Sequence, residues 1–379
     1  MPDLLFDNAA PFGADAPPLA MQDGRLCAPA SGMRRVDCDG FMVLPGIVDL
    51  HGDGFERHLA PRRGAVADLG EGLRAVDAEL AANGITTAVL AQFWSWEGGM
   101  RGPAFARALA EALQIHGARL KTRMILQLRL ETHTEDGFAA AEAFVAEAGI
   151  DYVVLNDHLP HRALAAGKRP PRLTGQALKS GRSPEAHLAL LQQLHRAQPH
   201  VEAALPGLCA RLRARGVRLG SHDDPTPERR ATLRAMGVRI AEFPETEAAA
   251  RAAHDAGDAV ILGAPNVMRG GSHKDNLRAQ DMVTTGVCDA LVSDYHYPSV
   301  RQAVFRLVRE GFPRSTAWSL VSANPAKILG LCDRGGLHAG QRADLVVLDA
   351  QTHDVGATFV GGRVSYAAGV FAERLMEAV

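Results

Sequence analysis

The chain has 379 residues, of which 47% are hydrophobic, so it can form one large domain or a barrel with a small partner domain. Its formal net charge of -2 argues against binding to nucleic acid or to a membrane surface, because both kinds of binding need a protein surface whose electrostatic field has one sign. No apolar run approaches the ~20 residues of a membrane-spanning helix, the N-terminus has no signal-peptide pattern, and the five scattered cysteines form no C-x-x-C pair. We therefore expect a soluble protein of the reducing cytoplasm.

The first element with clear chemistry is the stretch from Leu44 to Gly54. Residues 1–42, which precede it, carry prolines and glycines between short apolar pieces and predict small strands. If residues 47–53 form a strand, alternation places Asp49, His51 and Asp53 on one face, and the strand delivers His51 and Asp53 at its carboxyl end. A surface turn with solvated side chains is the alternative for this stretch alone.

Helical and strand patterns then alternate along the chain. Helical periodicity begins near residue 68 and returns at 103–118, 137–149, 184–215, 227–236, 246–256, 276–287 and 299–310. Strand patterns lie at 47–53, 85–91, 123–132, 152–157, 217–222, 239–243, 259–264 and 290–294. Eight strands alternating with helices predict an α/β fold of the (β/α)8 TIM-like barrel type. A doubly wound sheet is the main competitor, but no G-x-G-x-x-G follows the first strand.

The pattern changes after Asn324 and Pro325, which predict a helix start. Residues 340–349 and 358–365 resemble strands joined by turns, and we expect them to pair with the N-terminal strands in a small β-sandwich domain. The expected domains are thus residues 1–42 and 331–379 for the small β domain, and residues 43–330 for a metal-dependent barrel.

Ligand-type side chains end several of the predicted barrel strands. They are His51, Asp53, Glu131, His158, His222 and Asp294. A single strand-end histidine is more often a hydrogen-bonded group than a ligand, and a single carboxylate can cap a helix. Six such residues at one end of one barrel predict a metal site. Three imidazoles and three carboxylates without a thiolate suit two divalent metal ions, zinc in the first place, with Mn, Fe or Ni as alternatives.

These residues and their order resemble the amidohydrolase superfamily. The resemblance rests on His-x-Asp at 51–53, Ser-His-Asp-Asp at 221–224, Ser-Asp at 293–294 and Asn-Pro-Ala-Lys at 324–327. Further stretches, at 84–87, 156–158, 241–246 and 263–273, are similar to the family of α-D-ribose 1-methylphosphonate 5-triphosphate diphosphatases of the carbon-phosphorus lyase pathway. That resemblance implies hydrolysis of a 5-triphosphate to a 5-phosphate and pyrophosphate. The chain departs from the family pattern at 52–54, 159–161 and 296–297, so a related phosphorylated substrate stays open.

The loop after the seventh predicted strand has the composition of a phosphate-binding site. Its residues are Arg269, Gly270, Gly271, Ser272, His273 and Lys274. Glycines expose backbone N–H groups, and the other side chains add donors and positive charge, as a polyphosphate requires. Barrels commonly bind phosphate in the loops after strands seven and eight. A solvated surface turn is the alternative.

The sequence therefore predicts a metal-dependent hydrolase acting on a small phosphorylated substrate. Asp294 is expected to accept the proton of the attacking water, in addition to binding metal. A hydrolase of C–N bonds, acting on a cyclic amide, an amidine or an N-acetyl sugar, is the alternative, because the same chemistry serves both. A non-catalytic barrel is a third possibility. The sequence leaves open whether the chain forms a homo-oligomer.

Overall fold

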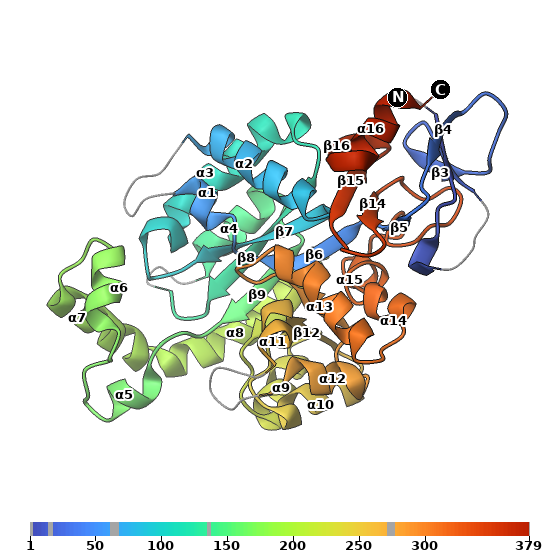
Figure 1. Ribbon diagram of the computed structural model, residues 1–379. Helices are drawn as coiled ribbons and strands as arrows, with labels where there is room; N and C mark the ends of the chain where they lie inside the picture. The colour runs from blue at the N-terminus through green and yellow to red at the C-terminus, as the bar shows by residue number, and fades with distance from the viewer. Residues whose placement is uncertain (1–2, 14–17, 61–67, 135–137, 271–276, 379) are drawn as a thin grey trace.

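The computed structural model describes residues 3–13, 18–60, 68–134, 138–270 and 277–378 (Figure 1). The strands are β1 (Leu4–Asp7), β2 (Leu19–Gln22), β3 (Arg25–Cys27), β4 (Arg34–Asp37), β5 (Phe41–Pro45), β6 (Ile47–Gly52), β7 (Ile85–Trp94), β8 (Arg123–Glu131), β9 (Tyr152–Asn156), β10 (Arg218–His222), β11 (Ile240–Glu242), β12 (Ala259–Gly263), β13 (Ala290–Val292), β14 (Leu345–Asp349), β15 (Val355–Val360) and β16 (Arg363–Ala367). The helices are η1 (Pro11–Gly13), α1 (Glu56–Leu59), α2 (Leu69–Ala82), η2 (Gly99–Arg101), α3 (Pro103–His116), η3 (Gly117–Arg119), α4 (Ala139–Glu147), α5 (His161–Ala165), α6 (Leu173–Lys179), α7 (Pro184–Arg196), α8 (Gln198–Ala214), α9 (Pro227–Ala235), α10 (Glu247–Asp255), α11 (Ala264–Arg269), α12 (Ala279–Thr284), α13 (Pro298–Arg309), α14 (Arg314–Ser319), α15 (Ala323–Ile328) and α16 (Gly369–Glu377).

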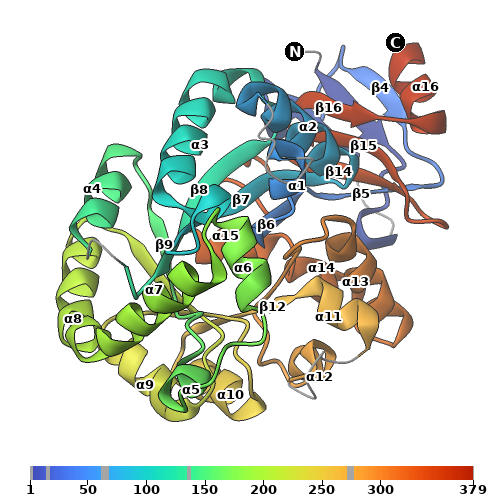
Figure 2. The same ribbon diagram turned by 90° about the vertical axis from the view of Figure 1, so that its left-hand side faces the viewer.

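The eight strands β6 to β13 form a barrel. Each of these strands pairs in parallel with the next one along the chain, and a parallel bridge between Gly52 and Asp294 joins β13 back to β6. The helices between the strands cover the outside of the barrel (Figure 2). The predicted (β/α)8 fold is confirmed. Because all eight strands run in the same direction, their carboxyl ends meet at one mouth.

The closure of the barrel depends on a glycine and on a buried carboxylate. A Cβ atom on Gly52 would lie 2.8 Å from Ser293 Oγ, so only glycine allows the first and last strands to approach this closely. Ser293 donates from its backbone N to Asp49 Oδ1 at 2.9 Å and from its hydroxyl to Asp49 Oδ2 at 2.6 Å. Asp49 therefore holds β13 against β6, directly below the mouth.

Local sequence accounts for the helices that follow the strands. Asp68 caps α2, because its side chain accepts a hydrogen bond from the backbone N of Glu71 at 2.8 Å. Leu73, Val76 and Leu80 then recur on one face of α2 and are fully buried against the barrel. The helix ends before Gly84, whose φ of 78° suits a helix C-terminus.

The two ends of the chain form a β-sandwich beside the barrel (Figure 1). One sheet has the order β3-β2-β1-β4, and the other has the order β16-β15-β14-β5. β5 pairs antiparallel with β14, so an N-terminal strand completes a sheet of C-terminal strands, as expected. Phe6 from the first sheet meets Phe359 from the second at a ring distance of 5.4 Å in the core between them.

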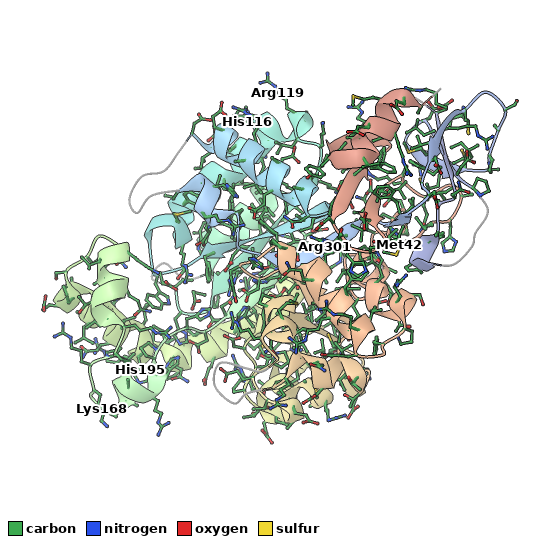
Figure 3. The ribbon with its side chains drawn as sticks, viewed as in Figure 1. Met42, His116, Arg119, Lys168, His195 and Arg301 are labelled. Carbon is green, nitrogen blue, oxygen red and sulfur yellow. The ribbon has the colours of Figure 1, made fainter. Side chains whose placement is uncertain are left out.

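A helical excursion, α5 to α8, separates β9 from β10. Figure 1 shows α5, α6 and α7 on the side of the barrel away from the sandwich, and Lys168 and His195 mark this region in Figure 3. The helical pattern at 184–215 forms two helices, because Pro199 at the first turn of α8 starts a new helix. Among the described residues, no helix combines the length and the apolar composition needed to cross a membrane.

Candidate active site at the mouth of the barrel

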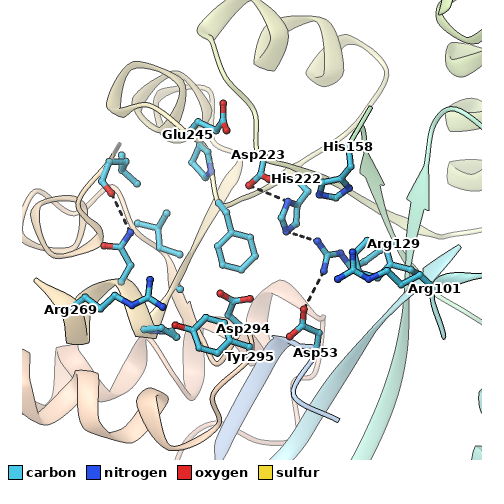
Figure 4. A pocket seen from close by; sticks show the side chains of 18 residues that line it. Asp53, Arg101, Arg129, His158, His222, Asp223, Glu245, Arg269, Asp294 and Tyr295 are labelled. Carbon is cyan, nitrogen blue, oxygen red and sulfur yellow. Dashed lines mark hydrogen bonds and ion pairs between the residues drawn. The ribbon is translucent and has the colours of Figure 1, made fainter. Parts of the chain in front are cut away.

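A cavity of about 400 Å³ lies at the carboxyl ends of the strands (Figure 4). Its polar lining consists of Asp53, Arg101, Arg129, His158, His222, Asp223, Glu245, Asn266, Arg269, Asp294 and Tyr295. Apolar side chains, among them Phe93 and Phe243, complete the wall. Four of the six predicted metal ligands therefore line one cavity. We refer to His51, Asp53, Glu131, His158, His222 and Asp294 together as the mouth cluster.

His51 lies beneath the cavity, fully buried, with its ring 5.6 Å from that of His222 and 5.1 Å from that of Phe243. Its Nδ1 donates to Glu242 Oε2 at 2.8 Å, and its Nε2 has no hydrogen-bond partner among the described residues. Burial alone would raise the pKa of Glu242, but the charge and the hydrogen bond of His51 lower it. The carboxylate therefore fixes the tautomer of His51, and the lone pair of Nε2 remains available.

Glu242 is held in turn by two further buried donors. Tyr152 donates its hydroxyl to Glu242 Oε1 at 2.5 Å, and Gln127 donates from Nε2 to the same oxygen at 2.9 Å. With His51, these donors satisfy a carboxylate that has no exposure to solvent. The barrel interior thus contains a connected polar network behind His51.

His222 sits at the centre of the cluster, in contact with an arginine. Arg129 donates from one Nη to His222 Nε2 at 2.9 Å, and its other Nη lies 3.6 Å from Asp53 Oδ2 (Figure 4). Burial and the positive charge of Arg129 lower the pKa of His222 to about 4. His222 is therefore neutral at pH 7, which is the form that binds metals. Its Nδ1 faces Asp223 Oδ1 at 3.2 Å.

Glu131 supports His158 from behind and does not line the cavity. Its carboxylate accepts from the backbone N of His158 at 3.1 Å and also contacts His158 Nδ1. Burial lowers the pKa of His158, but this hydrogen bond and the charge of Glu131 outweigh it and raise the pKa overall. The ring of His158 lies 5.8 Å from that of His222. His158 therefore reaches the cavity in a fixed orientation.

Asp294 enters the cavity from a sharp turn after β13. Its φ is 55°, and its backbone bonds on both sides to β6, since Asp53 N donates to Asp294 O at 2.8 Å and Asp294 N donates to His51 O at 3.0 Å. Burial, reinforced by the charge of Asp53, raises the pKa of Asp294 to about 6. Asp223 and Phe243 also have positive φ at strand ends. Three of the seven described non-glycine residues with positive φ thus lie at the mouth, and such backbone strain is common at functional sites.

The predicted phosphate loop is only partly described. Arg269 ends α11 and lines the cavity, with its guanidinium carbon 5.5 Å from the centre of the Tyr295 ring. Gly270 terminates the helix with a φ of 74°. Gly271, Ser272, His273 and Lys274 lie outside the described residues, so the structure does not place them.

Sequence reasoning missed several residues of the site. Glu242 ends strand β11, so the rule that identified the other strand-end residues would also have found it. Asp223 directly follows His222 within the Ser-His-Asp-Asp stretch. Arg101 had no such signal, because it reaches the cavity from η2.

The donor atoms at the mouth suit divalent metal ions. Three groups of three side chains bring their ligand atoms within 4.8 Å of one another, and two of them include His222. The groups are His51, His222 and Glu242; His158, His222 and Asp223; and Glu97, Glu131 and His158. The buried, unpartnered Nε2 of His51 is an atom that a metal would satisfy. A carboxylate on the far nitrogen of a histidine is the usual second partner of a metal ligand. The residues present therefore fit a metal centre.

Known proteins resemble this chain in sequence and in fold. A sequence model described as the Amidohydrolase family matches residues 68–366. The chain is similar to alpha-D-ribose 1-methylphosphonate 5-triphosphate diphosphatase of Escherichia coli (strain K12), with 33% identity over 356 residues, 91% of this chain and 93% of that protein.

Solved structures at low identity share the fold. N-acetylglucosamine-6-phosphate deacetylase from Pasteurella multocida has a TM-score of 0.65 and 12% identity, covering 97% of this chain and 100% of that one. N-isopropylammelide isopropylaminohydrolase from Burkholderia multivorans has a TM-score of 0.61 and 16% identity, covering 96% and 98%. At these identities the likeness concerns the fold alone, because one fold supports many reactions.

Proposed function

This chain belongs to the amidohydrolase family and is a hydrolase, and from that premise we propose that it cleaves a phosphoanhydride bond at a metal centre in the mouth of its barrel. The substrate proposed is α-D-ribose 1-methylphosphonate 5-triphosphate, cleaved to the 5-phosphate and pyrophosphate, as the name of the Escherichia coli relative suggests. The metals proposed are two divalent ions, zinc in the first place, held by residues of the mouth cluster other than Glu131, which instead orients His158.

The observation that carries the proposal is the presence of three arginines in the cavity wall, beside the carboxylates of Asp53, Asp223, Glu245 and Asp294. Arg101, Arg129 and Arg269 all line the space into which His158, His222 and Asp294 face. Guanidinium groups bind phosphate oxygens through paired hydrogen bonds. Arg269 has no carboxylate partner among the described residues, so its charge is available to a ligand. A neutral substrate would gain nothing from it.

The side chains divide the work of hydrolysis. A bound divalent ion supplies Lewis-acid activation of water and of a phosphoryl oxygen. Asp294 accepts the proton of the attacking water, for which its buried position and raised pKa are suited. Arg129 and Arg269 stabilise negative charge on the phosphoryl group and on the departing pyrophosphate. Glu242 and Glu131 hold His51 and His158 in orientation.

Hydrolysis of a C–N bond remains the second candidate. The cavity wall also contains Phe93, Phe243, Pro265 and Leu277, which suit an apolar or cyclic substrate. Water activated by the same metal ions and the same base would attack a carbonyl carbon. The two candidate reactions differ in the substrate group that the arginines neutralise, because only a phosphoanhydride substrate brings a polyphosphate to the reacting centre.

The test is a direct comparison of substrates on the metal-reconstituted enzyme. α-D-ribose 1-methylphosphonate 5-triphosphate, N-acetylglucosamine 6-phosphate and a cyclic amide would be assayed side by side, with release of pyrophosphate, of acetate and of the ring-opened product followed separately. The expected result is pyrophosphate from the triphosphate and no turnover of the other two. Turnover of the amide or the acetyl sugar with no pyrophosphate would replace this proposal with C–N hydrolysis.

A further inference from the structure

A second group of histidines lies outside the cavity, next to the mouth cluster. It consists of His133, which follows β8, Asp157, which follows β9, His161 at the start of α5, and His195 in the last turn of α7. We refer to these four residues as the outer cluster. None of them lines the cavity. Asp157 and His158 are consecutive residues, so the chain directs one side chain to each cluster.

The distances in the outer cluster are those of metal ligands. Asp157 Oδ1 lies 3.5 Å from His133 Nδ1, and Asp157 Oδ2 lies 3.0 Å from His161 Nε2. The ligand atoms of these three residues all fall within 4.8 Å of one another. Four donors placed tetrahedrally 2.0–2.1 Å from a zinc ion are separated by about 3.3 Å. An ion therefore fits among the three side chains with small adjustments.

His195 provides the supporting contact that such a site requires. Its Nδ1 lies 2.8 Å from His161 Nδ1, so one of the two nitrogens carries the proton of a hydrogen bond. With a metal on His161 Nε2, the Nδ1–H of His161 donates to His195. Ligating histidines usually make such a bond with their second nitrogen, and it fixes the ring.

His133 supplies the strongest sign that a ligand belongs there. The residue is only 2% exposed, and its Nε2 has no hydrogen-bond partner among the described residues. Its Nδ1, which faces Asp157 Oδ1 at 3.5 Å, makes one further long contact of 3.4 Å with Thr132 Oγ1. A buried imidazole with so few partners is costly, and a metal ion on one nitrogen would reduce that cost.

The donor types also favour a cation. One carboxylate with two imidazoles matches zinc and similar borderline divalent ions. The Asp157 and His161 side chains are 32% and 25% exposed, which leaves a path for the ion.

We propose that His133, Asp157 and His161 form a second metal site, with His195 as hydrogen-bonding partner, which binds a zinc-like divalent ion. Because His133 and Asp157 belong to the barrel whereas His161 and His195 belong to α5 and α7, the ion fastens the helical excursion to the barrel beside the mouth. The site is structural, and it does not depend on the reaction proposed above. An ion pair between Asp157 and His161, four residues apart, is the alternative.

The experiment counts metal ions. Wild-type protein, His161→Ala and Asp157→Asn would be purified without chelator, stripped, reloaded with Zn²⁺ or Co²⁺ and analysed by elemental mass spectrometry. Both variants should lose one molar equivalent relative to wild type, and the Co²⁺ absorption of that equivalent should disappear. His200→Ala, an exposed histidine on α8, is the matched control and should keep the full content.

Two further measurements separate this site from the mouth. His222→Ala should lose metal from the mouth and retain the equivalent that His161→Ala loses. Zinc should raise the melting temperature of wild type more than that of His161→Ala, because an ion bound only by the folded state stabilises it. A folded His161→Ala or Asp157→Asn protein with wild-type metal content would overturn the proposal. So would an equal loss in His200→Ala, which would indicate adventitious binding.

Discussion

The mouth cluster and the outer cluster are built from the same residue types, yet their surroundings differ. The mouth cluster opens into a cavity lined by three arginines and is backed by the buried carboxylate of Glu242. The outer cluster lines no part of that cavity and joins a helical excursion to the barrel. Histidines and carboxylates alone thus identify a candidate metal site, but access to a substrate cavity decides whether it can be catalytic.

The largest expected difference between the clusters concerns catalysis. Asp294→Asn should lower kcat by about 10²- to 10⁴-fold, because the amide cannot accept a proton. Asparagine tolerates the positive φ at this position, so the backbone should be kept. Steady-state kinetics with metal analysis would measure this, and Asp255→Asn at the exposed end of α10 is the control.

His161→Ala in the outer cluster should reduce kcat far less than Asp294→Asn. An equal loss in the two variants would mean that the clusters act as one site. Wild-type turnover in Asp294→Asn would remove this residue from the mechanism.

The burial of Asp49 below the mouth should make the free energy of unfolding depend on pH. Burial raises the pKa of Asp49 to about 6, above its unfolded value of about 3.9. The contribution of Asp49 to the free energy of unfolding is therefore complete below pH 4 and is lost as the pH rises through 6. Between pH 4 and 7, the metal-free Asp49→Asn protein should therefore gain about 3 kcal/mol of unfolding free energy relative to metal-free wild type. Urea unfolding at several pH values would test this, and parallel curves for the two proteins would contradict it.

The network behind His51 should affect metal affinity at the mouth alone. Glu242→Gln replaces the acceptor of three hydrogen bonds, from His51, Tyr152 and Gln127, and should weaken metal binding about 10- to 100-fold. Competition with a chelator of known affinity would measure the loss. The metal equivalent assigned to the outer cluster should bind as in wild type. A uniform loss at all sites would point to general unfolding instead.

The smallest expected effect concerns the positive charge of Arg269 in the cavity wall, a feature that the outer cluster does not have. Arg269→Ala should raise KM for the triphosphate substrate about tenfold, since a charge-assisted hydrogen bond contributes about 1.5 kcal/mol or more. Arg309→Ala, an exposed arginine at the end of α13, is the control and should behave as wild type. An unchanged KM in Arg269→Ala would weaken the case for a polyphosphate substrate.

The alternation of helices and strands could be predicted because it depends on local periodicity. Strand-end residues such as His51, His222 and Asp294 could be predicted to meet, because parallel strands present their carboxyl ends at one mouth. The split of residues 184–215 into two helices was not predicted, although Pro199 marks it. The contact of Glu131 with His158 was also outside the prediction, which placed both residues in the mouth as equals.

The sequence by itself determined the eight strands, the sandwich of the two chain ends and the ligand-type residues that end the strands, because each follows from patterns a few residues long. Only the tertiary structure decided that Glu242 stands behind His51, that Arg129 lies between Asp53 and His222, and that His195 returns to His161. These contacts join residues far apart in the chain. They arise from the closure of the barrel and the packing of the helical excursion, which no local pattern specifies.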